Sequence, residues 1–210
     1  MQRVRVKICG LCSAAEARAA AYAGADAIGL VFYAASARKV SVQQARAISA
    51  AVPPFVSRVA LFLDAPAEEV AQVVAELRPD MLQFHGREPA AFCRQFGVPY
   101  IKAVPMGDND IVLADWAASY HDAGALLLDA HRAGAAGGQG KRFGWDGATA
   151  MPDKPIIIAG GLSAANVHSA IEHFSPYAVD VSSGVESAPG VKDHARMEAF
   201  MRAINNAGSA

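Results

Sequence analysis

The sequence places one cysteine where it could act as a catalytic base. Cys9 directly follows the strand-like run Arg3–Ile8. A thiolate is a good base or nucleophile once nearby cations lower its pKa, and Lys7 lies two residues away on the same face of that strand. The alternative is a small buried hydrophobe, which is the usual role of an isolated cysteine and the one we expect for Cys12 and Cys93.

Asp129 is the candidate acid that would complement this thiol. It follows the three leucines Leu126–Leu128, and an acidic residue at the end of so apolar a run needs a reason. Asp129 can donate a proton if partial burial raises its pKa. The alternative is a structural cap or an ion pair with His131 or Arg132. Together, the thiol and the carboxyl group predict proton-transfer chemistry.

Three more polar residues are candidates for substrate contacts. Arg38 lies in a loop with other polar residues, where its guanidinium could clamp a carboxylate bidentately or simply lie in solvent. His85 is either a polar wall of the site or a satisfied core histidine, and we interpret it as a wall. Asp180, in the last strand-like run, is the third candidate for a substrate contact. No two-histidine-plus-carboxylate grouping has metal-ligand spacing in the sequence, so no metal is predicted.

Two glycine-containing turns predict a phosphate site. One is Ala159-Gly160-Gly161-Leu162-Ser163, and the other is Ser182-Ser183-Gly184-Val185. Glycine lets a phosphate approach backbone N–H groups that no Cβ shields, and a following helix N-terminus adds partial positive charge. The alternative is that these glycines only make tight turns. Because two such turns follow the last two strands, we favour a phosphate cradle formed by Gly160, Gly161, Ser183 and Gly184.

The composition limits the classes of protein to which this chain can belong. It has 210 residues, 53% of them hydrophobic, and a formal net charge of −1. This balance argues against a disordered chain and against a nucleic-acid-binding surface. Three cysteines are too few for a disulfide framework, which favours the reducing cytoplasm. The N-terminus has no secretory h-region and no apolar run is long enough to span a membrane, so no membrane partner is predicted.

Short β-rich runs alternate with alanine-rich amphipathic stretches from end to end, and glycine or proline ends most of the helices. The predicted strands are Arg3–Ile8, Asp26–Phe32, Val56–Leu63, Met81–Phe84, Tyr100–Val104, Ala125–Leu128, Pro155–Ala159 and Tyr177–Val181. The predicted helices are Ala14–Ala23, Val42–Val52, Ala67–Leu77, Pro89–Phe96, Ile111–Tyr120, a short one near Trp145–Ala150, Ala164–His173 and Asp193–Ile204.

Eight strand–helix units whose strands are continuous apolar runs indicate parallel strands buried on both faces. Such units form either a closed barrel or an open doubly wound sheet. With no insertion, no G-x-G-x-x-G after the first strand and no linker, we favour an α/β fold consisting of a single (β/α)8 TIM barrel over residues 1–210. Its active site would lie at the carboxyl ends of the strands.

With these residues in place, the chain resembles the phosphoribosylanthranilate isomerase family. The start Lys7-Ile8-Cys9-Gly10 and the segment Asp180-Val181-Ser182-Ser183-Gly184-Val185-Glu186 are specific in combination. Further matches are Gly29-Leu30-Val31-Phe32-Tyr33 with Ser36 and Arg38, Leu61-Phe62-Leu63-Asp64, Leu82-Gln83-Phe84-His85-Gly86, Leu128-Asp129-Ala130, Gly137-Gly138-Gln139-Gly140-Lys141, Ala159-Gly160-Gly161-Leu162 and Pro189-Gly190-Val191-Lys192-Asp193.

The resemblance implies an Amadori rearrangement of a small phosphoribosyl substrate in tryptophan biosynthesis. N-(5-phosphoribosyl)anthranilate would become 1-(2-carboxyphenylamino)-1-deoxyribulose 5-phosphate, with Asp129 as general acid and Cys9 as general base. Arg38 matches the residue that holds the anthranilate carboxylate, and Lys7, His85 and Asp180 are expected among the substrate contacts. No redox or hydrolytic step occurs, so no cofactor is expected. The chain is expected to be a cytoplasmic monomer or homodimer.

Two departures from the family pattern affect loops and leave the proposed acid and base unchanged. Ala37 stands where the family usually has proline, which would loosen the loop that carries Arg38. The glycine-rich segment Gly137–Lys141 contains Gln139 and is followed by Phe143-Gly144-Trp145, which changes a loop expected to cover the substrate. Two other functions remain as alternatives: another phosphosugar enzyme, such as an epimerase, and a non-enzymatic phosphosugar sensor on the same fold.

Overall fold

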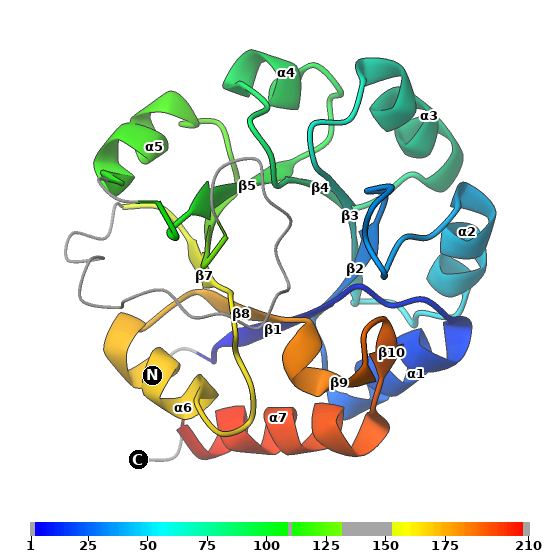
Figure 1. Cartoon of the computed structure of the whole chain (residues 1–210), viewed down its shortest axis with the longest axis vertical. Helices are drawn as coiled ribbons and strands as arrows, with labels where there is room; N and C mark the ends of the chain where they lie inside the picture. Colours follow the sequence, from blue (N-terminus) through cyan, green and yellow to red (C-terminus); the bar gives the residue numbers. More distant parts are fainter. Residues whose placement is uncertain (1–2, 109–110, 132–152, 208–210) are drawn as a thin grey trace.

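The strands form a closed barrel surrounded by helices, as Figure 1 shows from one end. The computed structural model describes residues 3–108, 111–131 and 153–207. The strands are β1 Arg5–Cys9, β2 Ala27–Val31, β3 Ser57–Phe62, β4 Met81–Phe84, β5 Tyr100–Pro105, β6 Ala125–Asp129, β7 Ile156–Ile158 and β8 Ala178–Val181. All are parallel to their neighbours, and β8 pairs with β1 from Arg5↔Ala178 to Ile8↔Val181. This pairing confirms the predicted barrel over an open sheet.

Helices cover the outside of the barrel (Figure 1). They are α1 Ala14–Ala23, α2 Val42–Ala50, α3 Ala67–Leu77, α4 Ala90–Arg94, α5 Leu113–Ser119, α6 Val167–Phe174 and α7 His194–Ala207. The bounds of α1 and α3 are those predicted. The helix predicted near Trp145–Ala150 and the segment Gly137–Lys141 lie outside the described residues.

Strand alternation divides the buried side chains into two layers, which confirms that both faces of the sheet are covered. In β6, Leu126 and Leu128 pack toward the helices, while Leu127 faces the barrel interior with a smaller cluster that includes Ile101 and Ile157. The same alternation puts Lys7 and Cys9, two residues apart, on the interior face of β1. The interior is thus apolar at the start of the strands and polar toward their ends.

A hydrogen-bonded group that contains the buried charges of Glu88 and Lys102 lies on the outer side of the barrel, and we call Asp64, Gly86, Glu88 and Lys102 the outer cluster. Lys102 is 0% exposed, and its Nζ donates to Gly86 O at 2.6 Å and to Glu88 Oε2 at 2.9 Å. Glu88 also accepts from the backbone N–H groups of Asp64 at 2.8 Å and Gly86 at 2.9 Å. The outer cluster therefore joins β5 to the chain segments after β3 and β4, and its two buried charges bind each other and backbone groups.

A β-hairpin follows β8, which the sequence did not predict. After a 3-10 helix, η2 (Ser183–Val185), the chain forms β9 (Glu186–Ala188) and β10 (Val191–Lys192). A Cβ on Gly190, in the turn between them, would lie 2.6 Å from the carbonyl oxygen of Ala37. The hairpin is therefore packed tightly against the loop that follows β2 and carries Arg38.

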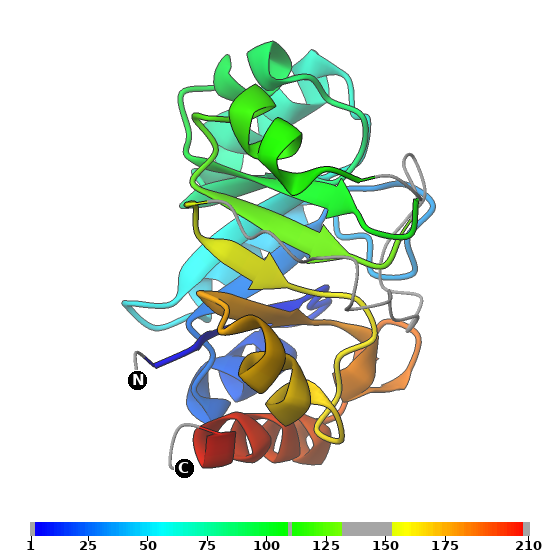
Figure 2. The ribbon, with the colours of Figure 1, turned by 90° about the vertical axis from the view of Figure 1, so that its left-hand side faces the viewer.

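All eight strands run in the same direction, so their carboxyl ends meet at one end of the barrel (Figure 2). The beginning of β1 and the end of α7 lie at the opposite end (Figure 2). None of the described helices combines the length and the apolar character needed to cross a membrane.

Candidate active site

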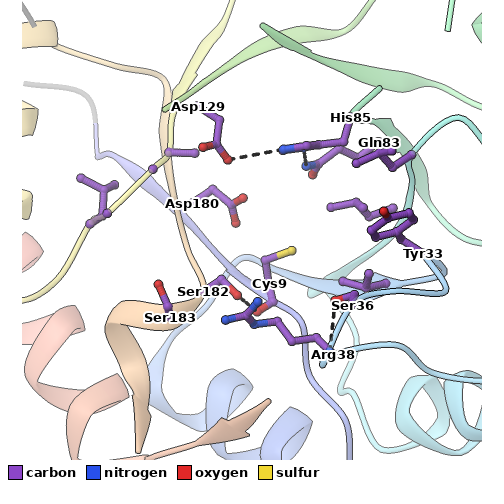
Figure 3. A pocket seen from close by; sticks show the side chains of 17 residues that line it. Cys9, Tyr33, Ser36, Arg38, Gln83, His85, Asp129, Asp180, Ser182 and Ser183 are labelled. Carbon is purple, nitrogen blue, oxygen red and sulfur yellow. Dashed lines mark hydrogen bonds and ion pairs between the residues drawn. The ribbon is translucent and has the colours of Figure 1, made fainter. Parts of the chain in front are cut away.

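The carboxyl ends of the strands surround a pocket of about 670 Å³, its mouth included (Figure 3). Most of the residues predicted for the site line it, from six different strands or the loops after them. They are Cys9, Arg38, His85, Asp129, Gly160, Gly161, Asp180 and Ser183. Two predicted residues do not line it: Lys7 lies one layer deeper, and Gly184 lies behind the loop that follows β7.

Cys9 ends β1, as predicted, and is 6% exposed. Burial raises the pKa of its thiol above the ordinary value of 9.0, and the nearby ammonium of Lys7 only partly offsets this effect. The expectation that Lys7 lowers the pKa of Cys9 below its usual range is therefore wrong in its net result. The cause is desolvation, which disfavours the thiolate more than one lysine favours it.

Lys7 is held by a carboxylate that sequence reasoning did not pair with it. Its Nζ donates to Asp180 Oδ1 at 3.0 Å, and the two side chains are 4% and 9% exposed. Burial by itself would lower the pKa of Lys7, but Asp180 and Cys9 together outweigh burial and raise it. Burial also raises the pKa of Asp180, an effect that Lys7 only partly offsets. Figure 3 shows Asp180 between Asp129 and Cys9 in the pocket.

Asp129 ends β6, and two imidazoles face its carboxylate. Oδ1 accepts from the backbone N–H of His131 at 3.3 Å and lies 3.7 Å from His131 Nδ1. Oδ2 lies 3.6 Å from His85 Nε2. Burial raises the pKa of Asp129, but the two histidines outweigh it and the net shift is downward. The expectation of a raised pKa is therefore wrong, because β4 and the chain after β6 bring polar partners to the carboxylate.

His85 is a neutral wall of the pocket. Burial lowers its pKa to about 3. Its ring stacks on that of His131, with centroids 4.2 Å apart, and its Nδ1 lies 3.3 Å from Gln83 Nε2. One ligand atom from each of His85, Asp129 and His131 lies within 4.8 Å of the others. The fold therefore makes a two-histidine-plus-carboxylate group that the sequence spacing did not reveal.

The two predicted phosphate loops lie side by side because of their glycines. Gly160 and Gly161 have φ angles of 80° and 66°, a region that side chains with a Cβ rarely adopt. A Cβ on Gly184 would lie 1.8 Å from the carbonyl oxygen of Leu162, so only glycine permits this approach. Within the described chain, the N–H groups of Gly160, Gly161, Ser183 and Gly184 have no hydrogen-bond partner.

Asn166, to which sequence reasoning gave no role, holds the first of these loops in shape. Its Oδ1 accepts from Ser163 N at 2.8 Å, and its Nδ2 donates to Gly161 O at 2.9 Å. Both bonds fix the turn that leads into α6. The predicted helix began at Ala164, but this turn delays the start of α6 to Val167.

Arg38 points into the pocket, but its fork is already bound to a carboxylate (Figure 3). Nε and Nη2 donate to the two oxygens of Glu186 at 2.7 and 2.8 Å. Lys192 Nζ donates to the same carboxylate at 2.6 Å and to Ser182 O at 3.1 Å. Sequence reasoning assigned no role to Glu186 or Lys192, although both lie in its quoted motifs. Here they fix the direction of the guanidinium.

Comparison with known proteins gives one consistent result. The family model described as N-(5'phosphoribosyl)anthranilate (PRA) isomerase matches residues 6–203. The chain is 50% identical over 210 residues to N-(5'-phosphoribosyl)anthranilate isomerase of Pseudomonas fluorescens (strain SBW25), and the match covers all of both chains.

Two solved structures show the same architecture. One is phosphoribosyl anthranilate isomerase in complex with reduced 1-(o-carboxyphenylamino)-1-deoxyribulose 5-phosphate, with a TM-score of 0.83 at 36% identity. The other contains mutually generated monomers of the dimeric enzyme from Thermotoga maritima, with a TM-score of 0.84 at 35% identity. In both cases the similarity covers 97% of this chain and 99% of the other.

Proposed function

The chain belongs to the family of N-(5'-phosphoribosyl)anthranilate isomerases, and from this premise we propose that Asp129 and Cys9 are its general acid and general base. The reaction is the isomerisation of N-(5'-phosphoribosyl)anthranilate in tryptophan biosynthesis. One observation carries the assignment of roles: a carboxyl group from β6 and a thiol from β1 open into the same pocket. Beside them are two loops whose N–H groups have no partner among the described residues.

The two residues act in sequence on the sugar. Asp129 donates a proton to the ring oxygen, the C1–O bond breaks, and the nitrogen lone pair forms a Schiff base with C1. The cationic nitrogen makes the C2 proton acidic, and Cys9 removes it. The electron pair of the C2–H bond forms the enolamine, which tautomerises to the ketone. Protons only change position, so the steps need no external oxidant or reductant.

The resting protonation states are the reverse of those that the reaction uses. The lowered pKa of Asp129 and the raised pKa of Cys9 give a carboxylate and a thiol at neutral pH. The active form carries the same number of protons, with one moved from the thiol to the carboxylate. The reactive fraction is therefore small but independent of pH between the two pKa values.

The phosphate binds to the N–H groups of the loops after β7 and β8. The loop at Gly160 and Gly161 leads into α6, whose N-terminus adds partial positive charge. Arg38 binds the anthranilate carboxylate from the opposite side of the pocket, and Glu186 holds its guanidinium in the binding direction. Lys7 and Asp180 keep the floor of the pocket polar beneath the sugar.

The decisive test compares single variants of the purified protein by the loss of anthranilate fluorescence during turnover. Cys9→Ala and Asp129→Asn are each expected to lose most turnover, while a phosphate-ester product analogue still binds. Full activity in either variant would remove that residue from the mechanism. Complementation of a tryptophan auxotroph that lacks this isomerase tests the activity itself, independently of the assigned roles.

We also propose that the chain forms a homodimer in the cytoplasm. Phe55, in the loop between α2 and β3, is fully exposed at 102% and lies beside a depression lined by Val52, Pro53 and Val56. So large an exposed apolar group favours a contact with a second copy. Sedimentation of the native protein and of Phe55→Ser tests this, because the variant is expected to shift toward the monomer. A catalytic thiol that must stay reduced suits the cytoplasm.

A further inference from the structure

Most of the unsatisfied buried polar atoms in the described chain lie in one place. Four buried side-chain atoms of the described residues have no hydrogen-bond partner, and three of them are Gln83 Oε1, His85 Nε2 and His131 Nδ1. The side chains of His85 and His131 are 5% and 2% exposed. An orphaned buried polar atom costs free energy, so the two imidazole nitrogens that face Asp129 indicate a missing partner that they share.

From this arrangement we infer that His85, Asp129 and His131 form a binding site for a divalent transition-metal ion, preferentially Zn²⁺, and that its occupation stops catalysis. Two imidazole nitrogens and a carboxylate oxygen are a common protein ligand set for zinc, with the fourth position left open. His85 and Asp129 line the pocket, so the open position faces the substrate. The inhibitory half of this inference rests on the proposed role of Asp129 as acid.

The imidazole nitrogens lie too far from the carboxylate for hydrogen bonds but close enough to converge with it on one ion. The separations of 3.6 and 3.7 Å between the imidazole nitrogens and the carboxylate oxygens exceed a normal hydrogen bond. A tetrahedral ion bound at about 2.0–2.1 Å separates two of its ligand atoms by roughly 3.3–3.4 Å. The two nitrogens face different oxygens of Asp129, and one ligand atom from each of the three residues lies within 4.8 Å of the others. Binding one ion therefore requires these atoms to move closer by up to about 1.4 Å. A turn of the stacked rings, whose χ2 angles vary broadly, can supply this movement.

Gln83 supplies the outer partner that a metal-bound histidine needs. A ligating histidine usually donates its other ring N–H to a carbonyl or carboxylate. Gln83 Nε2 now lies 3.3 Å from His85 Nδ1, and its own Oε1 is one of the unpartnered atoms. Turning the amide of Gln83 lets its Oε1 accept from the Nδ1–H of His85. The lone pair of His85 Nε2 is then available to the ion. With a metal bound and the amide turned, all three unsatisfied atoms have partners, and only the amide nitrogen of Gln83 is left without one.

The local charges also favour a cation. The ion-pair partners of Asp129 among the described residues are the two histidines, with no lysine or arginine. Lys7, deeper in the barrel, donates to Asp180 at 3.0 Å and not to Asp129. A bound ion would hold Asp129 as a carboxylate and block its acceptance of a proton, which removes the acid from the ring-opening step.

Calorimetric titration with Zn²⁺ in chelator-free buffer tests binding, with Mg²⁺ as the hard-cation comparison. The His131→Phe variant keeps an aromatic ring against His85 but removes the ligand nitrogen. Its Kd for Zn²⁺ is expected to rise at least tenfold, since even outer-shell changes cost that much. His168→Phe, at a half-exposed position on α6, is the matched control and should leave the Kd within about twofold. If His131→Phe misfolds by circular dichroism, His131→Asn replaces it.

Co²⁺ absorption distinguishes this site from one formed by the neighbouring thiol. The proposal predicts visible d–d bands without a thiolate charge-transfer band, and unchanged bands in Cys9→Ser. No saturable binding of Zn²⁺ at millimolar concentration, equal affinity in His131→Phe, or a thiolate band lost in Cys9→Ser would each overturn the proposed site.

Turnover in the presence of Zn²⁺ tests whether occupation of the site stops catalysis. Zn²⁺ is expected to inhibit the native chain reversibly with EDTA, and His131→Phe should need at least tenfold more Zn²⁺ for the same inhibition. Binding without inhibition would overturn the inhibitory role and, with it, Asp129 as the acid. Absence of binding, with Asp129→Asn inactive, would overturn the metal site and leave the proposed function intact.

Discussion

Buried charges lie both on the outer face of this barrel and in its pocket, and the two groups differ in how completely they are partnered. In the outer cluster, Lys102 and Glu88 bind each other and the backbone of neighbouring strand ends. In the pocket, Asp129 faces His85 Nε2 and His131 Nδ1 at 3.6 and 3.7 Å, and these two nitrogens have no hydrogen-bond partner in the described chain. Satisfied charges fix a structure, whereas unsatisfied ones are available to a ligand.

The largest effect on turnover is expected from a change at Asp129, in the incompletely partnered group of the pocket. Asp129→Asn should lower kcat by about 10²–10⁴-fold, the usual contribution of a positioned acid, and leave the melting temperature unchanged or higher. Asp115→Asn, on the exposed face of α5, is the control. Turnover and thermal unfolding measured together check this. A variant that loses stability and activity in parallel would erase the distinction between the two groups.

In the outer cluster, a substitution is expected to lower stability and leave turnover nearly unchanged. Lys102→Met leaves Glu88 buried without its ammonium partner and should lower the free energy of unfolding by about 3–5 kcal/mol. The folded fraction should keep its kcat within a few-fold. Urea unfolding measures the first quantity, and initial rates at low temperature measure the second. The double variant Lys102→Met with Glu88→Gln should recover part of the stability, because the unpaired charge is gone.

A smaller effect is expected where one carboxylate serves both structure and binding. Arg38→Ala should raise KM roughly tenfold, the value of one charge-assisted contact, with kcat nearly unchanged. Glu186 keeps Lys192 as a partner, so the fold should tolerate the change. Arg46→Ala, exposed on α2, is the control. An unchanged KM with normal kcat would contradict the binding role of Arg38.

The smallest expected effect is in the pH profile. Asp129 has a pKa lowered from 3.8 and Cys9 a pKa raised from 9.0, so their total proton count is constant between those values. The acid limb of kcat/KM lies below 3.8 because Asp129 protonates there, and the alkaline limb lies above 9.0 because Cys9 loses its proton there. Between about pH 5 and 8, kcat/KM should be flat within twofold. A limb within that range would mean that another group titrates.

Local sequence signals predicted most of the fold. Gly24 ends α1 in the left-handed conformation, and the helix bounds predicted from it agree with the structure. Pro79 similarly marked the region where α3 ends. The hairpin β9–β10 gave no such signal, because strands of two or three residues are too short for a period-two pattern to stand out.

The site was harder to predict because its chemistry depends on partners that are distant in the sequence. Cys9 and Asp129 were placed correctly at their strand ends, but both expected pKa shifts had the wrong sign. Burial of a thiol and the approach of His85, which is 44 residues from Asp129, cannot be seen in local spacing. The bidentate pair between Arg38 and Glu186 spans 148 residues and was missed for the same reason.

The placement of the chain's ends bears on how the protein can be joined to other molecules. The beginning of β1 and the end of α7 lie on the side of the barrel away from the pocket (Figure 2). A fusion partner, an affinity tag or an immobilising support attached at either end therefore leaves the entrance facing bulk solution. The same geometry would let a second enzyme be fused in tandem without obstructing the diffusion of substrate into this one.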